Sequence, residues 1–96
     1  MRHLYIVTYD ISDSRRWRRV YRTMRGFGQH MQLSVFQCDL TPTARIQMIA
    51  ALARAIHHDE DQVLVIDLGP TEARPVKHIE SLGRPMATHE RGATIV

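Results

Sequence analysis

The chain is predicted to adopt an α+β fold, because apolar strand-like segments alternate along it with two amphipathic helix-like segments. The order is strand, helix, one or two strands, helix and strand, with one or two short strand candidates after that. This order matches a ferredoxin-like two-layer sandwich, in which two helices cover one face of an antiparallel sheet. A length of 96 residues fits a single domain over residues 1–96.

The first strand is expected over residues 4–9, where β-branched and aromatic residues dominate. Its side chains are apolar at both odd and even positions, so both faces of this strand should be covered. Ser12 is the expected N-cap of the following helix. Asp13 would then lie in the first turn, where the helix dipole favours a negative charge.

The first helix is expected to be strongly amphipathic. Its apolar stripe has three- and four-residue spacing and consists of Trp17, Val20, Tyr21, Met24 and Phe27. The opposite side is basic and carries Arg15, Arg18, Arg19, Arg22 and Arg25, with Arg16 at the boundary. Gly26 and Gly28 should end this helix.

Residues 30–39 alternate in polarity and form either one long strand or two strands separated by a bulge. Thr41-Pro42 then predicts a helix start, since a capping residue precedes proline at the first helical position. The buried stripe of this second helix is expected to be Ile46, Ile49, Ala50, Ala53 and Ile56. The helix should end near His57-His58, which would interact with its dipole, and residues 59–61 should form a solvated turn.

A further strand is expected over residues 63–66, with Gly69-Pro70 ending it. Residues 76–80 are a candidate edge strand, and residues 93–96 form an apolar tip. The strands are apolar on the face turned away from the helices, which is normally bare in this fold. A second copy of the chain is the simplest cover for that face, so the sequence predicts a homodimer.

The net charge of +3 is unevenly distributed along the chain. Residues 1–48 carry eight arginines against three acids, a net +5, whereas residues 49–96 have a net charge of −2. Arginine offers phosphate a planar fork of donors, so an anionic partner is expected. The sequence has no membrane-spanning run or signal peptide, and its single cysteine, Cys38, is expected to be an inert buried thiol. These features predict a cytoplasmic protein without a membrane partner.

Asp10 is the first candidate functional residue, because it ends the first expected strand and precedes a helix. Magnesium binds one or two carboxylates and keeps several waters. A twofold axis near Asp10 would bring two such carboxylates together, and a metal would relieve their repulsion and activate a water or polarise a phosphodiester. Spacing alone also allows Asp10 to be a simple helix cap, and it favours that interpretation.

The basic side of the first helix is the second candidate. Phosphate contacts from Arg15, Arg16, Arg18, Arg19 and Arg22 would make binding salt-dependent. A solvated face is the alternative. However, few interleaved acids are available for i,i+4 pairs, and like charges at that spacing are destabilising. Phosphate contact therefore explains the pattern better than a solvated face does.

Three aromatic residues, Tyr9, Trp17 and Phe36, could stack on unpaired bases. Trp17 lies on the apolar stripe and is expected in the core, whereas Phe36 alternates onto one face with Gln32 and Ser34. Ser34 is not expected to be a nucleophile, since no histidine–acid pair is placed to serve it.

Taken in order, several segments resemble the CRISPR-associated protein-two family, the smaller of the two universal adaptation proteins. The segments are Tyr9-Asp10-Ile11, Asp13, the arginine-rich helix, Gly28, Gln32-x-Ser34-Val35-Phe36, Glu60-Asp61-x-Val63 and Ile79-Glu80-Ser81-Leu82-Gly83. The resemblance covers nearly the whole chain. Within it, Phe36 matches the family's phenylalanine after Ser-Val, and Arg19 matches its helix arginine.

The resemblance implies a ferredoxin-like homodimer in which the C-terminal segment, about residues 85–96, packs as an extra strand on the partner subunit. It implies an endonuclease for RNA or DNA that depends on Mg²⁺ or another divalent cation, with Asp10 as the catalytic and metal-binding residue. Tyr9, Ser34 and Phe36 would support that site. The resemblance also implies a scaffold role, bridging two dimers of the CRISPR adaptation integrase during spacer capture.

Two other functions are compatible with the sequence. A non-catalytic adaptor for double-stranded DNA would explain the arginine face and the single acid that each chain brings to the metal site. A toxin-like ribonuclease of the same fold is the other. The sequence does not distinguish RNA from DNA as the substrate.

Overall fold

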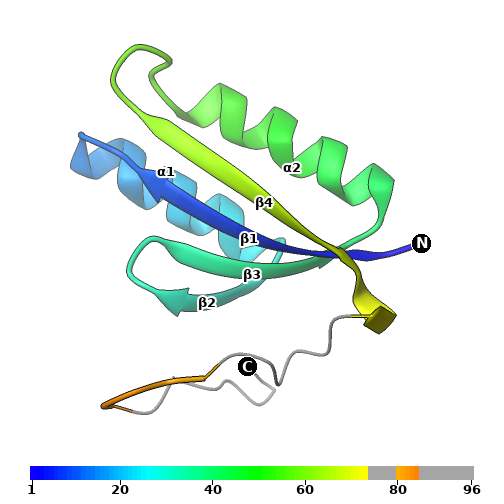
Figure 1. Cartoon of the computed structure of the whole chain (residues 1–96). Coiled ribbons are helices and arrows are strands. Elements are labelled where there is room, and N and C mark those ends of the chain that lie inside the picture. Colours follow the sequence, from blue (N-terminus) through cyan, green and yellow to red (C-terminus); the bar gives the residue numbers. More distant parts are fainter. Residues whose placement is uncertain (74–79, 85–96) are drawn as a thin grey trace.

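Four strands form one antiparallel sheet, and two helices cover one of its faces (Figure 1). The computed structural model describes residues 1–73 and 80–84. The elements are β1 (His3–Asp10), α1 (Ser14–Arg25), β2 (Gln29–Gln32), β3 (Val35–Leu40), α2 (Pro42–Ala55), β4 (Gln62–Pro70) and the 3-10 helix η1 (Thr71–Ala73). The strand order is β2-β3-β1-β4, which confirms the predicted ferredoxin-like sandwich.

The core lies between the sheet and the two helices, and the apolar central strand β1 supplies much of it. β1 pairs with β3 from His3↔Leu40 to Thr8↔Val35 and with β4 as far as Asp10↔Gln62. Buried side chains form one cluster made of Tyr5, Val7, Tyr9, Val20, Met24, Phe36, Cys38, Leu40, Met48, Leu52 and Ala55. The odd-numbered residues of β1 therefore face the helices.

The predicted apolar stripe of α1 is confirmed. Val20 and Met24 are fully buried, while Trp17, Tyr21 and Phe27 pack against the core cluster. Gly26 caps the C-terminus of the helix, also as predicted.

The predicted N-cap of α1 was wrong by one residue. Asp13 caps the helix, because its Oδ2 accepts a hydrogen bond from the Arg16 amide at 3.0 Å. Ser12 lies outside the helix and donates its own amide to Asp61 Oδ1 at 3.1 Å. Local propensity assigned the cap to Ser12, but Ser12 is bonded instead to Asp61, which lies 49 positions away in the chain.

Residues 29–40 form two strands, β2 and β3, joined by a turn at Leu33-Ser34. The pairing of β2 with β3 shifts register between His30 and Gln32, so Phe36 shares a face with its pairing partner His30, while Gln32 pairs with Val35 on the other face. The predicted placement of Phe36 with Gln32 was therefore wrong, and Phe36 lies in the core.

Gly28 lets the connection between α1 and β2 lie directly against β3. A Cβ at this position would clash with the carbonyl oxygen of Gln37 and with Cys38 Sγ. The same close packing encloses Cys38, and burial raises the pKa of its thiol to about 12. The prediction of an inert buried thiol is confirmed.

The start of α2 follows the prediction, since Thr41 Oγ1 accepts a hydrogen bond from the Ala44 amide at 3.1 Å. The predicted buried stripe was wrong except at Ile56, which packs against the core cluster. Met48, Leu52 and Ala55 are buried, whereas Ile46 is 63% exposed and Ile49 is also exposed. Apolar residues nearly surround this helix, so two stripes share the same spacing, and packing against the sheet selects between them.

β4 is longer than the predicted strand over 63–66, and it ends at Pro70, within the Gly69-Pro70 pair that was predicted to end it. The pairing of β1 with β4 shifts register between His3 and Tyr5, opposite Gly69, whose φ is +96°. Glycine adopts this left-handed conformation without strain and so permits the irregularity. Pro70 is tolerated at the end of an edge strand, where no partner needs its missing amide hydrogen.

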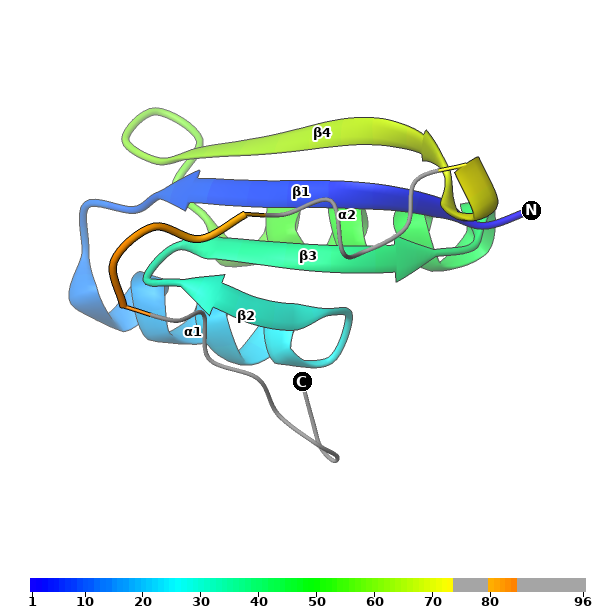
Figure 2. The ribbon, with the colours of Figure 1, turned by 60° about the horizontal axis from the view of Figure 1, so that its bottom comes forward.

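Figure 2 looks onto the sheet face opposite the helices. Apolar side chains lie on this face, as predicted. Ile6 pairs with Ile66, and Thr8 pairs with Leu64, while Leu64 and Ile66 are 49% and 45% exposed. We call this surface the open face.

Except for Glu80, the predicted edge strand over 76–80 and the C-terminal segment over 85–96 lie outside the described residues. Within residues 1–73 and 80–84, no helix is long and apolar enough to cross a membrane.

Candidate functional site

Asp10 is exposed at the end of the central strand β1, where it pairs with Gln62 of β4. Side chains alternate along a strand, so Asp10 projects toward the same side of the sheet as Ile6 and Thr8. That side is the open face. Asp10 therefore lies at the rim of the surface that a second copy of the chain is expected to cover.

Within the described residues, no local structural role accounts for Asp10. The capping role that spacing favoured belongs to Asp13. Among the side-chain hydrogen bonds and ion pairs formed within residues 1–73 and 80–84, none involves the Asp10 carboxylate. Within residues 1–73 and 80–84, Asp10 therefore serves neither as a helix cap nor as a member of an ion pair.

The donor set at this rim fits a magnesium ion held by few protein ligands. In the part of the chain that the structure describes, no three His, Cys, Asp or Glu side chains cluster closely enough to hold a cation. Within the described residues, a cation at Asp10 would therefore have at most one further His, Cys, Asp or Glu ligand from the same subunit. Magnesium accepts one or two carboxylates and completes its shell with water, whereas a closed protein cage would need more ligands.

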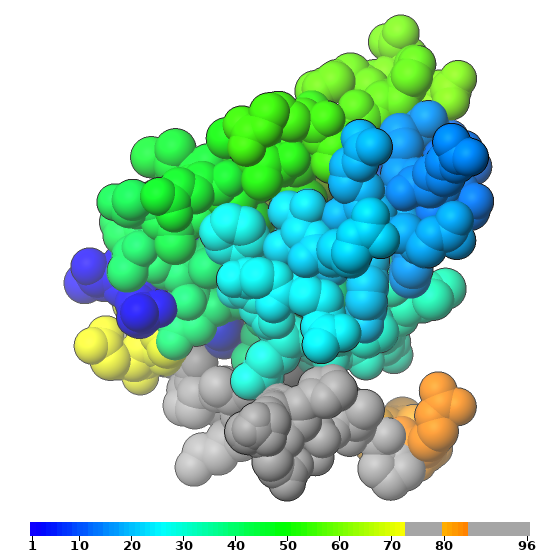
Figure 3. Space-filling model, turned by 180° about the vertical axis from the view of Figure 1, so that it is seen from behind, coloured from blue at the N-terminus to red at the C-terminus, as the bar shows by residue number. Residues whose placement is uncertain are grey.

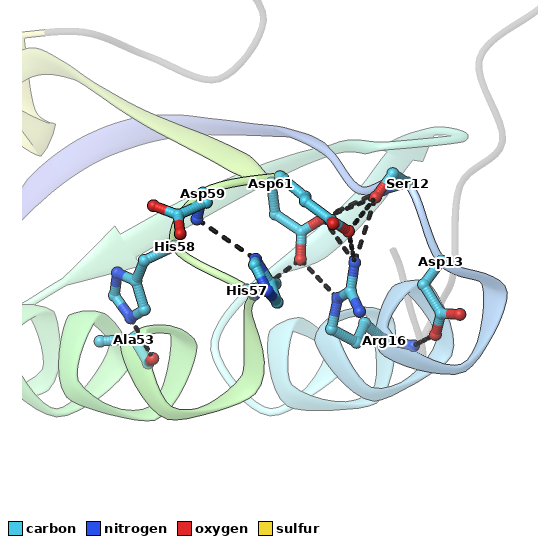
Figure 4. Close-up of polar contacts among 9 residues, drawn as sticks. Ser12, Asp13, Arg16, Ala53, His57, His58, Asp59 and Asp61 are labelled. Atoms are coloured by element: carbon cyan, nitrogen blue, oxygen red, sulfur yellow. Dashed lines mark hydrogen bonds and ion pairs between the residues drawn. The ribbon is translucent and has the colours of Figure 1, made fainter.

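The loop that follows Asp10 is held by a group of polar residues centred on Asp61 (Figure 4). Arg16 donates to Asp61 from Nε at 2.7 Å and from Nη2 at 3.2 Å, and the amides of Ser12 and His57 donate to the same carboxylate at 3.1 and 2.8 Å. The Asp61 side chain is 0% exposed. We call Ser12, Arg16, His57, Glu60 and Asp61 the Asp61 cluster.

The electrostatics of the cluster favour the charged form of both partners. The Arg16 guanidinium, together with the amides of His57 and Ser12, holds the pKa of Asp61 well below its usual range despite burial. Asp61 in turn raises the pKa of Arg16. Glu60 is the outer member, with its Oε1 lying 3.3 Å from Arg16 Nη2. A two-point arginine–carboxylate contact of this kind is stronger and more directional than a single hydrogen bond.

Four of the predicted phosphate-binding residues, Arg15, Arg18, Arg19 and Arg22, are exposed on α1. Figure 3 looks onto the helix layer, where α1 lies beside α2. Arg16 differs from these four, because it is half-buried and bound to Asp61. The arginines lie in the helix layer and Asp10 projects toward the opposite face, so one subunit does not bring them together on one surface.

Tyr9 and Phe36 are buried, and Ser34 is half-buried. Phe36 is fully buried, Tyr9 is 5% exposed, and their ring centroids are 6.3 Å apart. Ser34 Oγ accepts a hydrogen bond from Trp17 Nε1 at 3.0 Å. Burial, with Tyr21 nearby, raises the pKa of Tyr9 to about 12. The hypothesis that Tyr9 and Phe36 stack on bases was wrong, because core packing encloses both rings.

The acidic turn before β4 was only partly predicted. Asp59 and Glu60 are exposed, as a solvated turn requires, but Asp61 is enclosed by the loop after β1. His58 Nε2 lies 2.9 Å from the Ala53 carbonyl oxygen, which confirms the expected interaction at the end of α2. The sequence signal for the Asp61 cluster was the boundary position of Arg16, whose partner only the fold brings near.

The fold and site define a ferredoxin-like α+β protein with an exposed carboxylate at the end of its first strand and an arginine-rich first helix. The family model described as CRISPR associated protein Cas2 matches residues 1–75. The chain belongs to this family, and the resemblance noted in the sequence is confirmed.

Two relatives match nearly the full length of the chain. The protein named CRISPR-associated endoribonuclease Cas2 of Geobacter sulfurreducens is 50% identical over 96 residues, which is 100% of both chains. CRISPR-associated endoribonuclease Cas2 1 of Rhodospirillum rubrum is 49% identical over 94 residues, covering 98% of this chain and 91% of the relative.

Solved structures agree with the fold. The crystal structure of Streptococcus pyogenes Cas2 at pH 6.5 matches with a TM-score of 0.71 and 28% identity, covering 83% of this chain and 99% of that one. The hypothetical protein TT1823 of Thermus thermophilus matches with a TM-score of 0.75 and 25% identity, covering 88% and 94% of the two chains.

Proposed function

We propose that this chain is a magnesium-dependent endonuclease that cleaves RNA as a homodimer, with Asp10 of each subunit as the metal-binding catalytic residue. The observation that carries the proposal is the position of Asp10, exposed at the end of a buried central strand with no structural partner among the described residues. The names of two near full-length relatives favour RNA as the substrate, with DNA as the alternative.

The chain's own residues would hold, orient and support the site. β1 is paired with β3 as far as Thr8 and with β4 as far as Asp10, and this pairing anchors the strand end that carries Asp10. A magnesium ion bound there would polarise a phosphate oxygen and lower the pKa of a bound water. Asp10 would supply the anionic ligand, while the exposed arginines of α1 would hold the phosphates of the nucleic acid.

The homodimer supplies what one subunit lacks. Ile6, Leu64 and Ile66 make the open face apolar, and half-exposed residues of this kind favour burial against another apolar surface. Asp10 lies at the rim of the same face. Isologous packing of two open faces would therefore bring two Asp10 carboxylates toward one axis, where they could share a cation.

A direct test compares the parent protein with the Asp10→Ala variant on single-stranded RNA and duplex DNA, with Mg²⁺ or with a chelator. Cleavage should require both the metal and Asp10. The loss should be at least about 100-fold, since even outer-shell partners of metal ligands contribute about 10–100-fold. An Asp10→Ala protein that cleaves as fast as the parent would rule out this function.

A second candidate function is a double-stranded DNA adaptor that bridges two dimers of the CRISPR adaptation integrase. The exposed positions of Arg15, Arg18, Arg19 and Arg22 favour it, because a row of free guanidinium groups suits a phosphate backbone. This role needs no catalysis, so Asp10→Ala should spare it. Only the shared fold favours a toxin-like ribonuclease.

A further inference from the structure

Arg16 is set apart from the other arginines of α1 by its surroundings. Its side chain is 23% exposed, and both of its bonds to Asp61 fall within hydrogen-bond distance, at 2.7 and 3.2 Å. It also donates from Nη2 to Ser12 Oγ at 3.1 Å. A guanidinium engaged in this way has fewer donors left for a phosphate than the four exposed arginines have.

Asp61 joins three parts of the chain through one carboxylate (Figure 4). It accepts from Ser12 in the loop after β1, from Arg16 in α1, and from the His57 amide after α2. Ser12 lies two residues beyond Asp10. On the other side, Asp61 directly precedes Gln62, which is the pairing partner of Asp10 in β4. The cluster therefore holds the loop after Asp10 and the start of β4, the strand with which Asp10 pairs.

We propose that Asp61 and Arg16 are positioning residues that fix the Asp10 carboxylate at the rim of the open face. The proposal rests on the proposed nuclease function of Asp10. The Asp61–Arg16 pair sets the path of the chain from Asp10 to Asp13, while the pairing of β1 with β4 sets the strand end itself. In this proposal Arg16 does not bind phosphate, although the sequence predicted that it would.

The two roles of Arg16 make opposite predictions for Asp61→Asn. If Arg16 bound phosphate, removing the negative charge of Asp61 would free the guanidinium and leave nucleic-acid binding equal or tighter. If Arg16 positions Asp10, Asp61→Asn and Arg16→Ala should damage the same step to a similar degree. The double variant should then be no worse than either single variant, because both remove one interaction.

The experiment measures kcat and KM for RNA cleavage, and the Mg²⁺ concentration for half-maximal rate, in Asp61→Asn, Arg16→Ala and the double variant. We expect kcat to fall by roughly 10- to 100-fold with KM changed less than about twofold, since a displacement near 1 Å at a reacting group can cost that much. Arg19→Ala is the matched variant on the exposed side of α1, and it should raise KM instead.

Arg16→Lys keeps the charge but cannot form the two-point contact, so it carries the test if Asp61→Asn does not fold. It should lower kcat by roughly 10-fold. Unchanged kcat in Asp61→Asn or Arg16→Lys, with an active parent and an inactive Asp10→Ala, overturns the proposal. A higher KM with unchanged kcat in Arg16→Ala also overturns it.

If the proposed nuclease function is wrong, the parent and Asp10→Ala will show the same rate of RNA cleavage, so that failure can be told apart from failure of the positioning role. In that case, an Mg²⁺ titration followed through the amide resonances of Asp10 and Ile11 decides the positioning role. A midpoint several-fold higher in Asp61→Asn than in the parent supports it. An unchanged midpoint, or a parent that binds no Mg²⁺, overturns it.

Discussion

Asp10 and Asp61 lie at the same end of the sheet, where β1 stops and β4 starts, but their environments are opposite. Asp10 ends β1 and is exposed, whereas Asp61 lies just before β4, with its carboxylate enclosed by donors from Ser12, Arg16 and His57. Their neighbours explain the difference, since Asp61 faces α1 and its arginine while Asp10 projects toward the open face. The Asp61 carboxylate is bonded within the fold, and the Asp10 carboxylate is the one that we propose binds the metal.

The same contrast separates the arginines of α1. Arg16 has an acidic partner inside the molecule, while Arg15, Arg18, Arg19 and Arg22 are exposed on the helix. A basic helix is therefore not a uniform binding surface. Arg16 forms an ion pair within the fold, and the exposed arginines are the ones that we propose bind an external anion.

The largest effect is expected on dimer formation, when the contact that we propose for the open face is disrupted. Ile66→Asp places a charge in the proposed dimer interface and should raise the dimer dissociation constant at least about 30-fold, as expected for loss of an interface hot spot. Cleavage should be lost with the dimer. Sedimentation velocity and the RNA assay measure both.

Ile46→Asp is the matched control for Ile66→Asp, because Ile46 is similarly exposed but lies on α2 in the other layer. It should leave the dimer and the cleavage rate unchanged. A dimer that persists in Ile66→Asp, or that dissociates equally in Ile46→Asp, would show that the open face is not the interface.

The effect of intermediate size is expected on duplex DNA binding, and it should distinguish the exposed arginines of α1 from Arg16. Arg15→Ala with Arg19→Ala should weaken duplex DNA binding roughly tenfold at low salt and reduce the salt slope by about one unit per lost phosphate contact. Arg16→Ala should leave the slope nearly unchanged. Fluorescence anisotropy at several salt concentrations measures both, and equal slopes for all variants would contradict the distinction.

The smallest effect should be a pH dependence of stability that belongs to Asp61. The pKa of this carboxyl is lowered in the folded state, so its stabilising contribution is present above the ordinary aspartate pKa near 4 and is lost as pH falls through the lower folded value. Asp61→Asn should therefore lower the melting temperature by several degrees at neutral pH.

The difference in melting temperature between parent and Asp61→Asn should shrink below about pH 4. Thermal denaturation at a series of pH values measures it. Asp10→Asn serves as the comparison and should change the melting temperature little at any pH. A gap that stays constant down to the lowest pH would show that the Asp61 charge is not what stabilises the cluster.

The two helices show how far periodicity could predict this fold. The stripe of α1 was predicted correctly because charged residues fill its other side and leave one possible apolar face. α2 has isoleucines and alanines around most of its circumference, and the predicted stripe with Ile46 and Ile49 turned outward while Met48 and Leu52 filled the core. Periodicity identifies a buried face only when the opposite face is polar.

The residues of the candidate site also divide into those that could be predicted from the sequence and those that could not. Asp10 was identified from its place after an apolar strand, and the exposed arginines were identified from their side of the helix. Asp61 was assigned to a solvated turn, and its pairing with Arg16 joins residues 45 positions apart in the chain. No local pattern encodes a contact at that separation, because only the packing of α1 beside the turn before β4 creates it.

The sequence by itself determined the order of the elements, the ferredoxin-like class, the buried face of α1 and the strand-end position of Asp10, because these follow from short-range periodicity and turn chemistry. Only the tertiary structure decided which face of α2 is buried, which residue caps α1, and which arginine is bound within the molecule. These outcomes depend on competition among partners distant in the chain, and folding resolves that competition by burying the best-matched surfaces and pairing the charges they enclose.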